Sequence, residues 1–321
     1  MVKNEKILII KLGALGDVIL STPMIRQIIK FHHDVPVWLL TSPPFPEIFK
    51  NQELLNVISF PRKGLINSLK TLAWIRKQKF NRVYDLQSND RTAVICGLSS
   101  IPEKVGSRPG FPYNFHPPNK YTGQYHVFER LYEILESAGI KTSRQLPELI
   151  ISDTDRKTVK DFMEKHNLTE KSFVILHAGS SDRHPQKCWP YFTDLAKYLS
   201  QSGYQIIWVG SDVEARDNRQ RARITGIDSS SLFSINQLAE LGRHACFAVT
   251  NDSGPMHVLA TAGIPVFSFF GPTNWRRHHA IGQEQNVITA DNNSDSVFNP
   301  KPLEKISLDH ALAKLRSEKF I

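Results

Sequence analysis

The stretch 249–273 contains the residues of this chain best suited to hold a phosphate group. An apolar strand is followed by Asp252, Ser253 and Gly254, and then by a helix that we expect over about 254–262. These three residues lie where free backbone N–H groups converge with the positive end of the helix dipole. A diphosphate is the natural ligand there. The alternative is an ordinary turn in which Ser or Asp only caps the helix.

A second group of candidate phosphate ligands lies in the polar loop 178–187, after the apolar strand 173–177. Hydroxyl and cationic side chains suit phosphate oxygens because charge-assisted hydrogen bonds are short and strong. The alternative is a solvated surface loop with incidental charge. The candidates in this loop are Ser180, Ser181, Arg183 and Lys187.

The N-terminus repeats the order of strand, glycine turn and helix. The apolar run 6–12 is typical of a strand, and Gly13 and Gly16 let backbone approach a ligand closely. Asp17 begins the following helix, where its carboxylate either caps the helix or faces a cleft. The turn lacks the full Gly-x-Gly-x-x-Gly spacing and no acidic residue ends the next strand, so a dinucleotide site has poor support.

Strands alternate with helices around these motifs, which predicts an α/β fold with parallel, doubly wound sheets. Ligands of such sheets bind beyond the carboxyl ends of the strands, where all three motifs fall. The stretch 101–121 is rich in proline and aromatic residues and is expected to be a loop. The expected strands are 6–12, 36–40, 82–86, 173–177, 205–210, 246–250 and 265–270, and the expected helices of the second half are 190–201, 213–224, 236–244 and 254–262.

The length of 321 residues predicts two domains, since it exceeds one ordinary core. We expect an N-terminal domain over 1–160 and a C-terminal domain over 161–321. The polar, helix-like segment 152–166 is the candidate linker between them. A closing helix is expected over 308–320.

The formal net charge of +9 indicates an anionic partner. Seven cations and no acidic residue lie between positions 54 and 84, and the stretch 104–126 also lacks acidic residues. A solvated basic helix face is the alternative. Nucleic acid is not expected, because no base-stacking or DNA-reading motif accompanies the charge. Candidate anion-binding residues are Gly13, Lys63, Arg76 and, after the second turn, Arg276.

Metal binding and export have little support. Three scattered cysteines indicate neither a disulfide framework nor a zinc site, and the paired histidines are neighbours in sequence, which do not converge on one ion. The opening apolar run is too short for a signal segment, and no stretch approaches the roughly 18 apolar residues of a spanning helix. We therefore expect a cytoplasmic protein.

Together these motifs resemble glycosyltransferase family 9, the ADP-heptose:lipopolysaccharide heptosyltransferases. The resemblance covers nearly the whole chain, and four motifs in the same order make it specific. It implies a GT-B fold, in which two Rossmann-like domains face a cleft with acceptor on the N-terminal side and nucleotide sugar on the C-terminal side. It also implies that the closing helix packs back on the first domain. The motifs are 7–23, 177–180 with 187–190, 251–254 with His257, and 270–273.

The resemblance also implies the chemistry: transfer of a heptose from ADP-heptose to the inner core of lipopolysaccharide with inversion. Asp17 matches the aspartate assigned as the base. Backbone N–H groups, hydroxyls and a lysine support the leaving diphosphate, so neither a metal nor another cofactor is expected. Glu214 matches an acidic position that contacts the ribose in relatives, although Asp212 is close enough to replace it. The donor set is Ser180, Ser181, Lys187, Glu214, Asp252, Ser253, Gly254 and His257, the last of which either reaches the donor or packs beneath the loop.

The implied acceptor is an anionic glycolipid, with peripheral contact at the cytoplasmic face of the inner membrane. Three departures limit the transfer of substrate identity. Ser253 stands for a more usual threonine, the loop after His177 is longer, and Trp275, Arg276 and Arg277 form either a clamp or an exposed basic turn. The alternatives are a transferase for another nucleotide sugar and an inactive nucleotide-sugar-binding protein.

Overall fold

The computed structural model describes residues 5–180, 185–290 and 300–321. The chain divides into two compact units, residues 1–150 (unit 1) and 151–321 (unit 2). Each unit is built around one parallel sheet. None of the helices in the described part of the chain is long and apolar enough to cross a membrane.

Unit 1 contains a five-stranded parallel sheet in the order β3-β2-β1-β4-β5. The order reverses between the neighbours β1 and β4, which creates a switch point where the loops that follow them diverge. The strands are β1 Ile7–Ile10, β2 Val37–Thr41, β3 Leu55–Ser59, β4 Arg82–Asp85 and β5 Glu103–Val105, and the helices are α1 Leu15–Leu20, α2 Thr22–Phe31, α3 Leu65–Gln78, α4 Asp90–Leu98 and α5 Val127–Ser137, with a 3-10 helix η1 at Phe45–Phe49.

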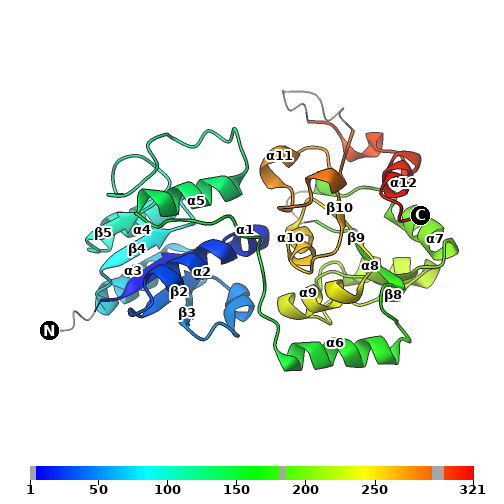
Figure 1. Ribbon diagram of the computed structural model, residues 1–321, viewed down its shortest axis with the longest axis horizontal. Coiled ribbons are helices and arrows are strands. Elements are labelled where there is room, and N and C mark those ends of the chain that lie inside the picture. The colour runs from blue at the N-terminus through cyan, green and yellow to red at the C-terminus, as the bar shows by residue number, and fades with distance from the viewer. Residues whose placement is uncertain (1–4, 181–184, 291–299) are drawn as a thin grey trace. The chain divides into compact units, whose positions relative to one another are not determined.

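Helices cover both faces of this sheet, so its middle strand β1 is apolar along its whole length. Leu8 and Ile10 of β1 pack in one core cluster with Ile75 of α3 and Ile95 of α4. Helices α2 and α5 contact each other on the other face (Figure 1). Burial on both sides explains why β1 has no alternating polar positions.

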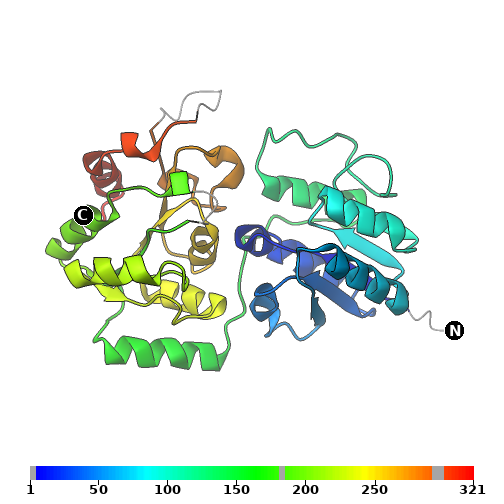
Figure 2. The same ribbon diagram turned by 180° about the vertical axis from the view of Figure 1, so that it is seen from behind.

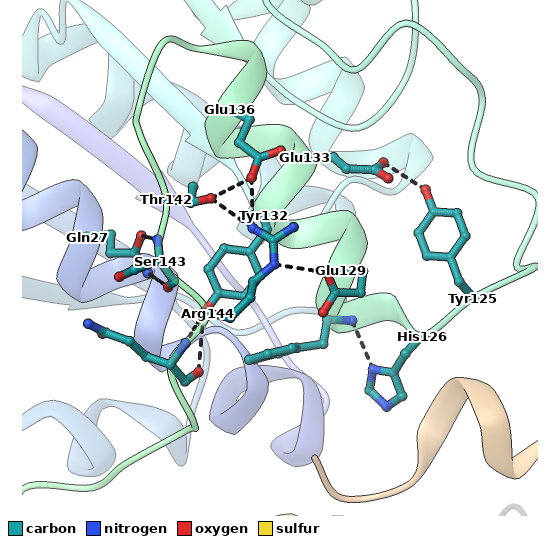
Figure 3. A network of polar contacts seen from close by, with 12 residues as sticks. Gln27, Tyr125, His126, Glu129, Tyr132, Glu133, Glu136, Thr142, Ser143 and Arg144 are labelled. Carbon is teal, nitrogen blue, oxygen red and sulfur yellow. Dashed lines mark hydrogen bonds and ion pairs between the residues drawn. The ribbon is translucent and has the colours of Figure 1, made fainter. Parts of the chain in front are cut away.

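The chain that leaves α5 is fastened to unit 1 by polar contacts (Figure 3). Arg144 lies over the Tyr132 ring, 4.3 Å from its centroid, and donates to Glu129 at 3.0 Å and to Glu136 at 2.8 Å. The backbone of Ser143 exchanges two 3.0 Å hydrogen bonds with the side chain of Gln27 on α2. These contacts hold the exit segment against α2 and α5 before the chain reaches residue 150.

Unit 2 contains a six-stranded parallel sheet in the order β11-β10-β9-β6-β7-β8, with its switch point between β6 and β9. The strands are β6 Phe173–His177, β7 Gln205–Trp208, β8 Ile227–Asp228, β9 Ala248–Asn251, β10 Val266–Phe270 and β11 Val287–Thr289, and the helices are α6 Asp153–Lys165, α7 Phe192–Gln201, α8 Ala215–Ile224, α9 Ile235–His244, α10 Gly254–Ala260, α11 Trp275–His278 and α12 Leu308–Ser317, with 3-10 helices η2 Pro185–Lys187, η3 Glu284–Asn286 and η4 Leu303–Lys305.

Alternate residues of β6 serve two separate cores in unit 2. Val174 and Leu176 pack in the cluster that includes α7 and α12. Phe173 and Ile175 pack in the cluster that includes α6, α9 and α10. The two-residue period of a strand thus directs successive side chains to opposite helical layers.

The predicted doubly wound α/β class is confirmed in both units. All seven expected strands are present with boundary shifts of a few residues, and so are the four expected helices of the second half. Four strands were missed. β3 is an edge strand in which only Leu55 is buried, and β5, β8 and β11 have only two or three residues. The stretch 101–121 is largely loop, as expected, apart from β5.

Two expectations about the domains need correction. The candidate linker is helix α6, which contacts α9 and belongs wholly to unit 2, so the division falls at residue 150 and not at 160. The closing helix α12, which was expected to pack on the first domain, packs on α7 within unit 2. Its apolar side chains Leu312 and Leu315 are buried in the unit 2 core, and the Tyr204 hydroxyl donates to the Phe320 carbonyl at 2.8 Å.

Candidate active site

The candidate phosphate ligands of unit 2 meet at the switch point of its sheet. The loop after β6 and the turn after β9 leave adjacent parallel strands, so both start at the same edge. The loops after β7 and β10 join them there, since those strands run in the same direction. Residues distant in sequence are thereby brought together at one edge.

Lys187 and Asp252 form an ion pair at this edge. The Lys187 Nζ lies 2.6 Å from Asp252 Oδ2, and the Thr273 hydroxyl donates to the same oxygen at 2.6 Å. The side chains of Lys187 and Asp252 are only 20% and 10% exposed, which limits solvent screening of the pair. Asp252 therefore holds the ammonium group in a fixed position beside the turn instead of capping α10.

Ser253 does not cap helix α10 either. It occupies the N-cap position, but its hydroxyl makes no cap hydrogen bond. The hydroxyl lies 3.1 Å from His177 Nδ1 and donates to the Asn251 carbonyl at 3.2 Å. Since neither side chain of the turn caps the helix, the alternative of an ordinary capped turn does not describe this site. The backbone of Ser253 and Gly254 begins a helix of seven residues.

His177 was missed as a candidate, although it links two parts of the site. It ends the buried strand β6 and is 2% exposed. Its Nδ1 faces the Ser253 hydroxyl, and its Nε2 lies 3.0 Å from Glu214 Oε1. The available signal in the sequence was a single polar ring at the end of a strand that is otherwise apolar.

Glu214 is held as a carboxylate by these contacts. Burial opposes its ionisation, but the hydrogen bond and charge of His177, together with donors from Ser211, outweigh that effect and lower the Glu214 pKa to about 2. Ser211 donates its backbone N–H at 2.7 Å and its hydroxyl at 2.8 Å. Gly179 leaves the necessary space, since a Cβ there would lie 1.4 Å from Glu214 Oε1.

Asn251 and Trp189 fix the loop that carries Lys187. The fully buried Asn251 amide accepts from the Trp189 N–H at 3.0 Å and donates to the carbonyls of Ala178 and Gly179 at 2.9 and 3.1 Å. The Trp189 ring stacks on Phe269 with 4.0 Å between centroids, and its Nε1 donates to the Ile306 carbonyl at 2.7 Å. Residues on both sides of the Lys187 loop, at 178–179 and at 189, are therefore anchored to Asn251.

A pocket of about 460 Å³ opens beside this network. Its volume is within the range typical of small-molecule sites. The wall on one side comes from the loop after β6, and the wall on the other side comes from the start of α8. Lining residues with polar or reactive groups include Ser180, Cys188, Glu214, Asp217 and Arg221.

The remaining donor candidates differ in their positions. His257 lies on α10 and is buried, 8% exposed, consistent with packing beneath the turn. Arg276 lies on α11 after β10, and its guanidinium lies 4.8 Å from the Trp275 ring centroid. Asp212 lies in the turn before α8, and Ser211 beside it contacts Glu214. Ser181 and Arg183 lie outside the described residues.

The switch point of unit 1 carries Gly13 and Asp17. Asp17 lies in the first turn of α1, and its Oδ2 accepts from the Ala14 N–H at 3.1 Å. Gly13 has a φ of +126°, which disfavours other residues, and a Cβ there would meet the Phe45 ring at 2.7 Å and Arg62 Nη1 at 3.3 Å. The carboxylate thus has a capping contact, which leaves its proposed role as a base open.

A buried amine and a buried carboxylate lie behind this loop, and neither was singled out from the sequence. Lys11 follows β1, Asp85 is the last residue of the neighbouring strand β4, and both are less than 5% exposed. Burial lowers the Lys11 pKa, and attraction to Asp17 and Asp85 opposes the decrease. Asp85 has its pKa raised by burial, and it accepts from Tyr113 at 2.5 Å. The signal was a lysine that ends an apolar strand just before the glycine turn.

The cationic candidates of unit 1 lie at opposite edges of its sheet. Lys63 follows β3 and therefore lies at the same edge as Gly13. Arg76 lies in the last turn of α3, which leads to the amino end of β4, and its Nε donates to the Leu98 carbonyl at 2.9 Å. The structure does not bring Arg76 to Asp17, because a crossover helix returns the chain to the far edge of the sheet.

Metal-binding groups are not found in the part of the chain that the structure describes. No three His, Cys, Asp or Glu side chains there lie close enough to hold an ion.

Comparison with known proteins extends over nearly the whole chain. Lipopolysaccharide heptosyltransferase 1 of Campylobacter coli is 27% identical, with 94% of this chain and 93% of that protein covered. A family 9 glycosyl transferase structure from Veillonella parvula aligns with a TM-score of 0.81 and 22% identity over 98% of this chain and 96% of its own. The structure of ADP-heptose LPS heptosyltransferase II of E. coli aligns with a TM-score of 0.75 and 19% identity over 97% and 98%.

The likeness to these structures confirms the expected GT-B fold. The model of glycosyltransferase family 9 (heptosyltransferase) matches residues 69–306, about three quarters of the chain. The match includes the loop of Lys187, the Asp252 turn and Glu214. The chain therefore belongs to glycosyltransferase family 9, the heptosyltransferases.

Proposed function

We propose that this protein transfers a heptose from ADP-heptose to an inner-core acceptor of lipopolysaccharide, with inversion at the anomeric carbon. The names of the relatives support both substrates: one is a lipopolysaccharide heptosyltransferase, and another is an ADP-heptose LPS heptosyltransferase. The observation that carries the proposal is the interlocked site of unit 2. There Lys187 is held by Asp252, and His177 joins Ser253 to Glu214.

The donor binds at the switch point of unit 2 in this proposal. Lys187 and the backbone N–H groups of Ser253 and Gly254 contact the diphosphate, because they offer positive charge and donors at one edge. Glu214 accepts from the ribose hydroxyls, since its low pKa keeps it an acceptor at neutral pH. Ser180 adds a hydroxyl from the wall of the pocket.

Asp17 acts as the general base. An acceptor hydroxyl attacks the anomeric carbon of the heptose, and its proton passes to the Asp17 carboxylate. The bond from that carbon to the diphosphate oxygen breaks, and ADP leaves with the electron pair. Lys187 and the N–H groups stabilise the developing negative charge. The reaction in this form uses no metal and no other cofactor.

The acceptor is an anionic glycolipid that approaches unit 1. Gly13 and Lys63 lie at the edge that carries Asp17, and Arg276 of unit 2 supplies a further cation. A lipid-borne acceptor requires peripheral contact with the cytoplasmic face of the inner membrane. The protein in this proposal is cytoplasmic and reaches its acceptor at that surface.

Calorimetric binding of ADP, GDP, UDP and CDP without added metal tests the donor site. We expect ADP to bind preferentially and Lys187→Ala to weaken that binding. Lys197→Ala is the matched control, because Lys197 is an exposed lysine of α7 that pairs with Asp194. Preference for another base would redirect the proposal to a different nucleotide sugar. Binding of none of the four would refute the phosphate site, and ADP binding without heptose transfer would indicate an inactive binding protein.

A further inference from the structure

Six large apolar side chains are exposed on one side of unit 1. Each is between 50% and 89% exposed, and they represent nearly half of the 13 exposed large apolar side chains among the described residues. Isolated exposed apolar side chains are common, but a cluster marks a binding surface. The six are Leu65, Ile66 and Leu69 of α3, Val94 and Leu98 of α4, and Phe111 of the loop after β5.

These side chains lie on neighbouring elements, whose exposed side we call the α3–α4 outer face. Helices α3 and α4 lie side by side, as Figure 2 shows, and Arg91 of α4 donates to the Gly64 carbonyl before α3 at 3.0 Å. Phe111 lies against α4, because a Cβ at Gly97 would lie 3.0 Å from its ring. The apolar cluster thus spans two helices and a loop.

The same surface carries positive charge. Helix α3 has no acidic residue, and its exposed positions include Lys70 and Lys77. The acidic residue at the start of α4, Asp90, is paired with Arg108 at 2.7 Å. Apolar side chains among cations are the pattern of a surface that enters the interface of an anionic membrane. A second copy of this face would instead place like charges together.

The surface also adjoins the loop of the proposed base. Arg62 lies three residues before the start of α3, and its Nη1 would lie 3.3 Å from a Cβ at Gly13. Leu65 and Ile66 are in the first turn of α3, at the same edge of the sheet. A membrane that contacts these residues therefore lies next to the Gly13–Asp17 loop.

We propose that the α3–α4 outer face binds bilayers that contain anionic phospholipid. The apolar side chains enter the boundary between headgroups and acyl chains, while Lys70 and Lys77 contact anionic headgroups. This inference rests on the proposed function, in which a membrane lipid carries the acceptor. It specifies which surface of unit 1 contacts the membrane and that this membrane contains anionic lipid.

Co-sedimentation of the full chain with vesicles tests the proposal. We expect binding to vesicles of phosphatidylcholine mixed with phosphatidylglycerol, weaker binding to phosphatidylcholine alone, and weakening by salt. The double variant Ile66→Ser, Leu69→Ser should reduce partitioning into mixed vesicles by about tenfold or more. The double variant Ile224→Ser, Leu232→Ser is the matched control, since both residues are 56% exposed in unit 2, and it should bind like the unmodified protein.

A second variant separates charge from apolar contact. Lys70→Gln with Lys77→Gln should lower partitioning into mixed vesicles by about tenfold and make it less sensitive to salt, with little effect on phosphatidylcholine vesicles. Thermal unfolding of every variant reports whether unit 1 keeps its fold, and ADP binding reports whether unit 2 does. ADP binding also separates failure of this inference from failure of the proposed function, because the residues altered on the α3–α4 outer face do not lie in unit 2.

Three outcomes would overturn the inference. One is the absence of vesicle binding by the unmodified protein, and another is an equal loss in the Ile224 and Leu232 control. The third is a dimer in sedimentation velocity that dissociates with Ile66→Ser and Leu69→Ser, since a second copy would then cover the face. The first of these outcomes is also the one expected if the partner of this face is an acidic protein.

Discussion

The two switch points of this protein have the same place in the same topology but differ in how their side chains are held. In unit 2, His177, Lys187, Asp252 and Glu214 each contact another side chain of the site. In unit 1, the single hydrogen bond found for the Asp17 side chain among the described residues is the cap to Ala14. The candidate donor residues of unit 2 are fixed by contacts with one another, whereas the Asp17 side chain is hydrogen-bonded to the backbone at the start of its own helix.

This difference fits the two substrates of the proposed reaction. A nucleotide sugar is small, and a site with fixed donors binds it without losing further side-chain entropy. A lipid-borne acceptor arrives from a surface and brings its own anionic groups. Unit 1 accordingly offers an edge with Lys63 and Arg62 next to the apolar start of α3. The comparison predicts that substitutions in the two units affect different steps.

The largest effect should come from Asp17→Asn. Asparagine can still accept from the Ala14 N–H through its Oδ1, so it preserves the cap and removes the base. We expect kcat to fall by about 10²–10⁴ while ADP binding stays unchanged. Turnover measured with saturating donor, together with calorimetry, checks this. Unchanged turnover would mean that Asp17 is only a cap.

Lys187→Ala in unit 2 should weaken donor binding, whereas Lys63→Ala in unit 1 should weaken acceptor binding. Loss of Lys187 removes charge-assisted bonds and leaves Asp252 near the diphosphate, so ADP affinity should fall about 10- to 100-fold. Lys63→Ala should leave ADP affinity unchanged and raise the KM for acceptor. Calorimetry and steady-state kinetics measure both effects. A similar loss of ADP affinity in both variants would contradict the assignment of the donor to unit 2.

Glu214→Gln should cost stability only above acidic pH. The folded pKa of about 2 is below the ordinary value of 4.5, so the carboxylate stabilises the fold above about pH 4.5, and this stabilisation is lost as the pH falls toward 2. We expect a difference of about 2 kcal/mol in the free energy of unfolding near neutral pH. Urea unfolding over pH 3–7 measures it. Glu164→Gln, in an exposed pair on α6, is the control and should change stability little.

Substitutions of His177 should have the smallest effect, and this effect should be limited to recognition of the ribose 2′-hydroxyl. Asparagine places its amide near the former Nδ1 and keeps the Ser253 contact, whereas glutamine reaches the former Nε2 and keeps the Glu214 contact. We expect the preference for ADP over 2′-deoxy-ADP to fall about five- to tenfold in His177→Asn and less in His177→Gln. An equal loss in both variants, or an unchanged preference, would show that His177 does not position Glu214.

Much of the site could be predicted because its residues follow apolar strands in a parallel fold. Lys187, Asp252 and Ser253 were placed at one edge from the alternation of strands and helices alone. The position of Arg76 was not predicted, because strand β3 was missed. Without β3, the sequence does not show that α3 carries Arg76 back to the amino ends of the strands.

Partners across the fold were beyond the sequence for a different reason. The link from His177 to Glu214 joins residues 37 positions apart, and it depends on the space left by Gly179. The packing of helix α12 on α7 was not predicted, because an amphipathic helix shows which of its faces is apolar but not which core covers that face. Such pairings depend on three-dimensional packing, which spacing does not specify.

The hydrogen bond from Trp189 to the Ile306 carbonyl makes the end of the chain relevant to anyone who redesigns this protein. Deletion of the segment from residue 306 onward would remove a support of the Lys187 loop without altering any proposed donor ligand. An affinity handle would therefore be safer at the N-terminus. We expect shortened forms made for crystallisation to lose nucleotide affinity because the Lys187 loop loses this support, although every proposed ligand is still present.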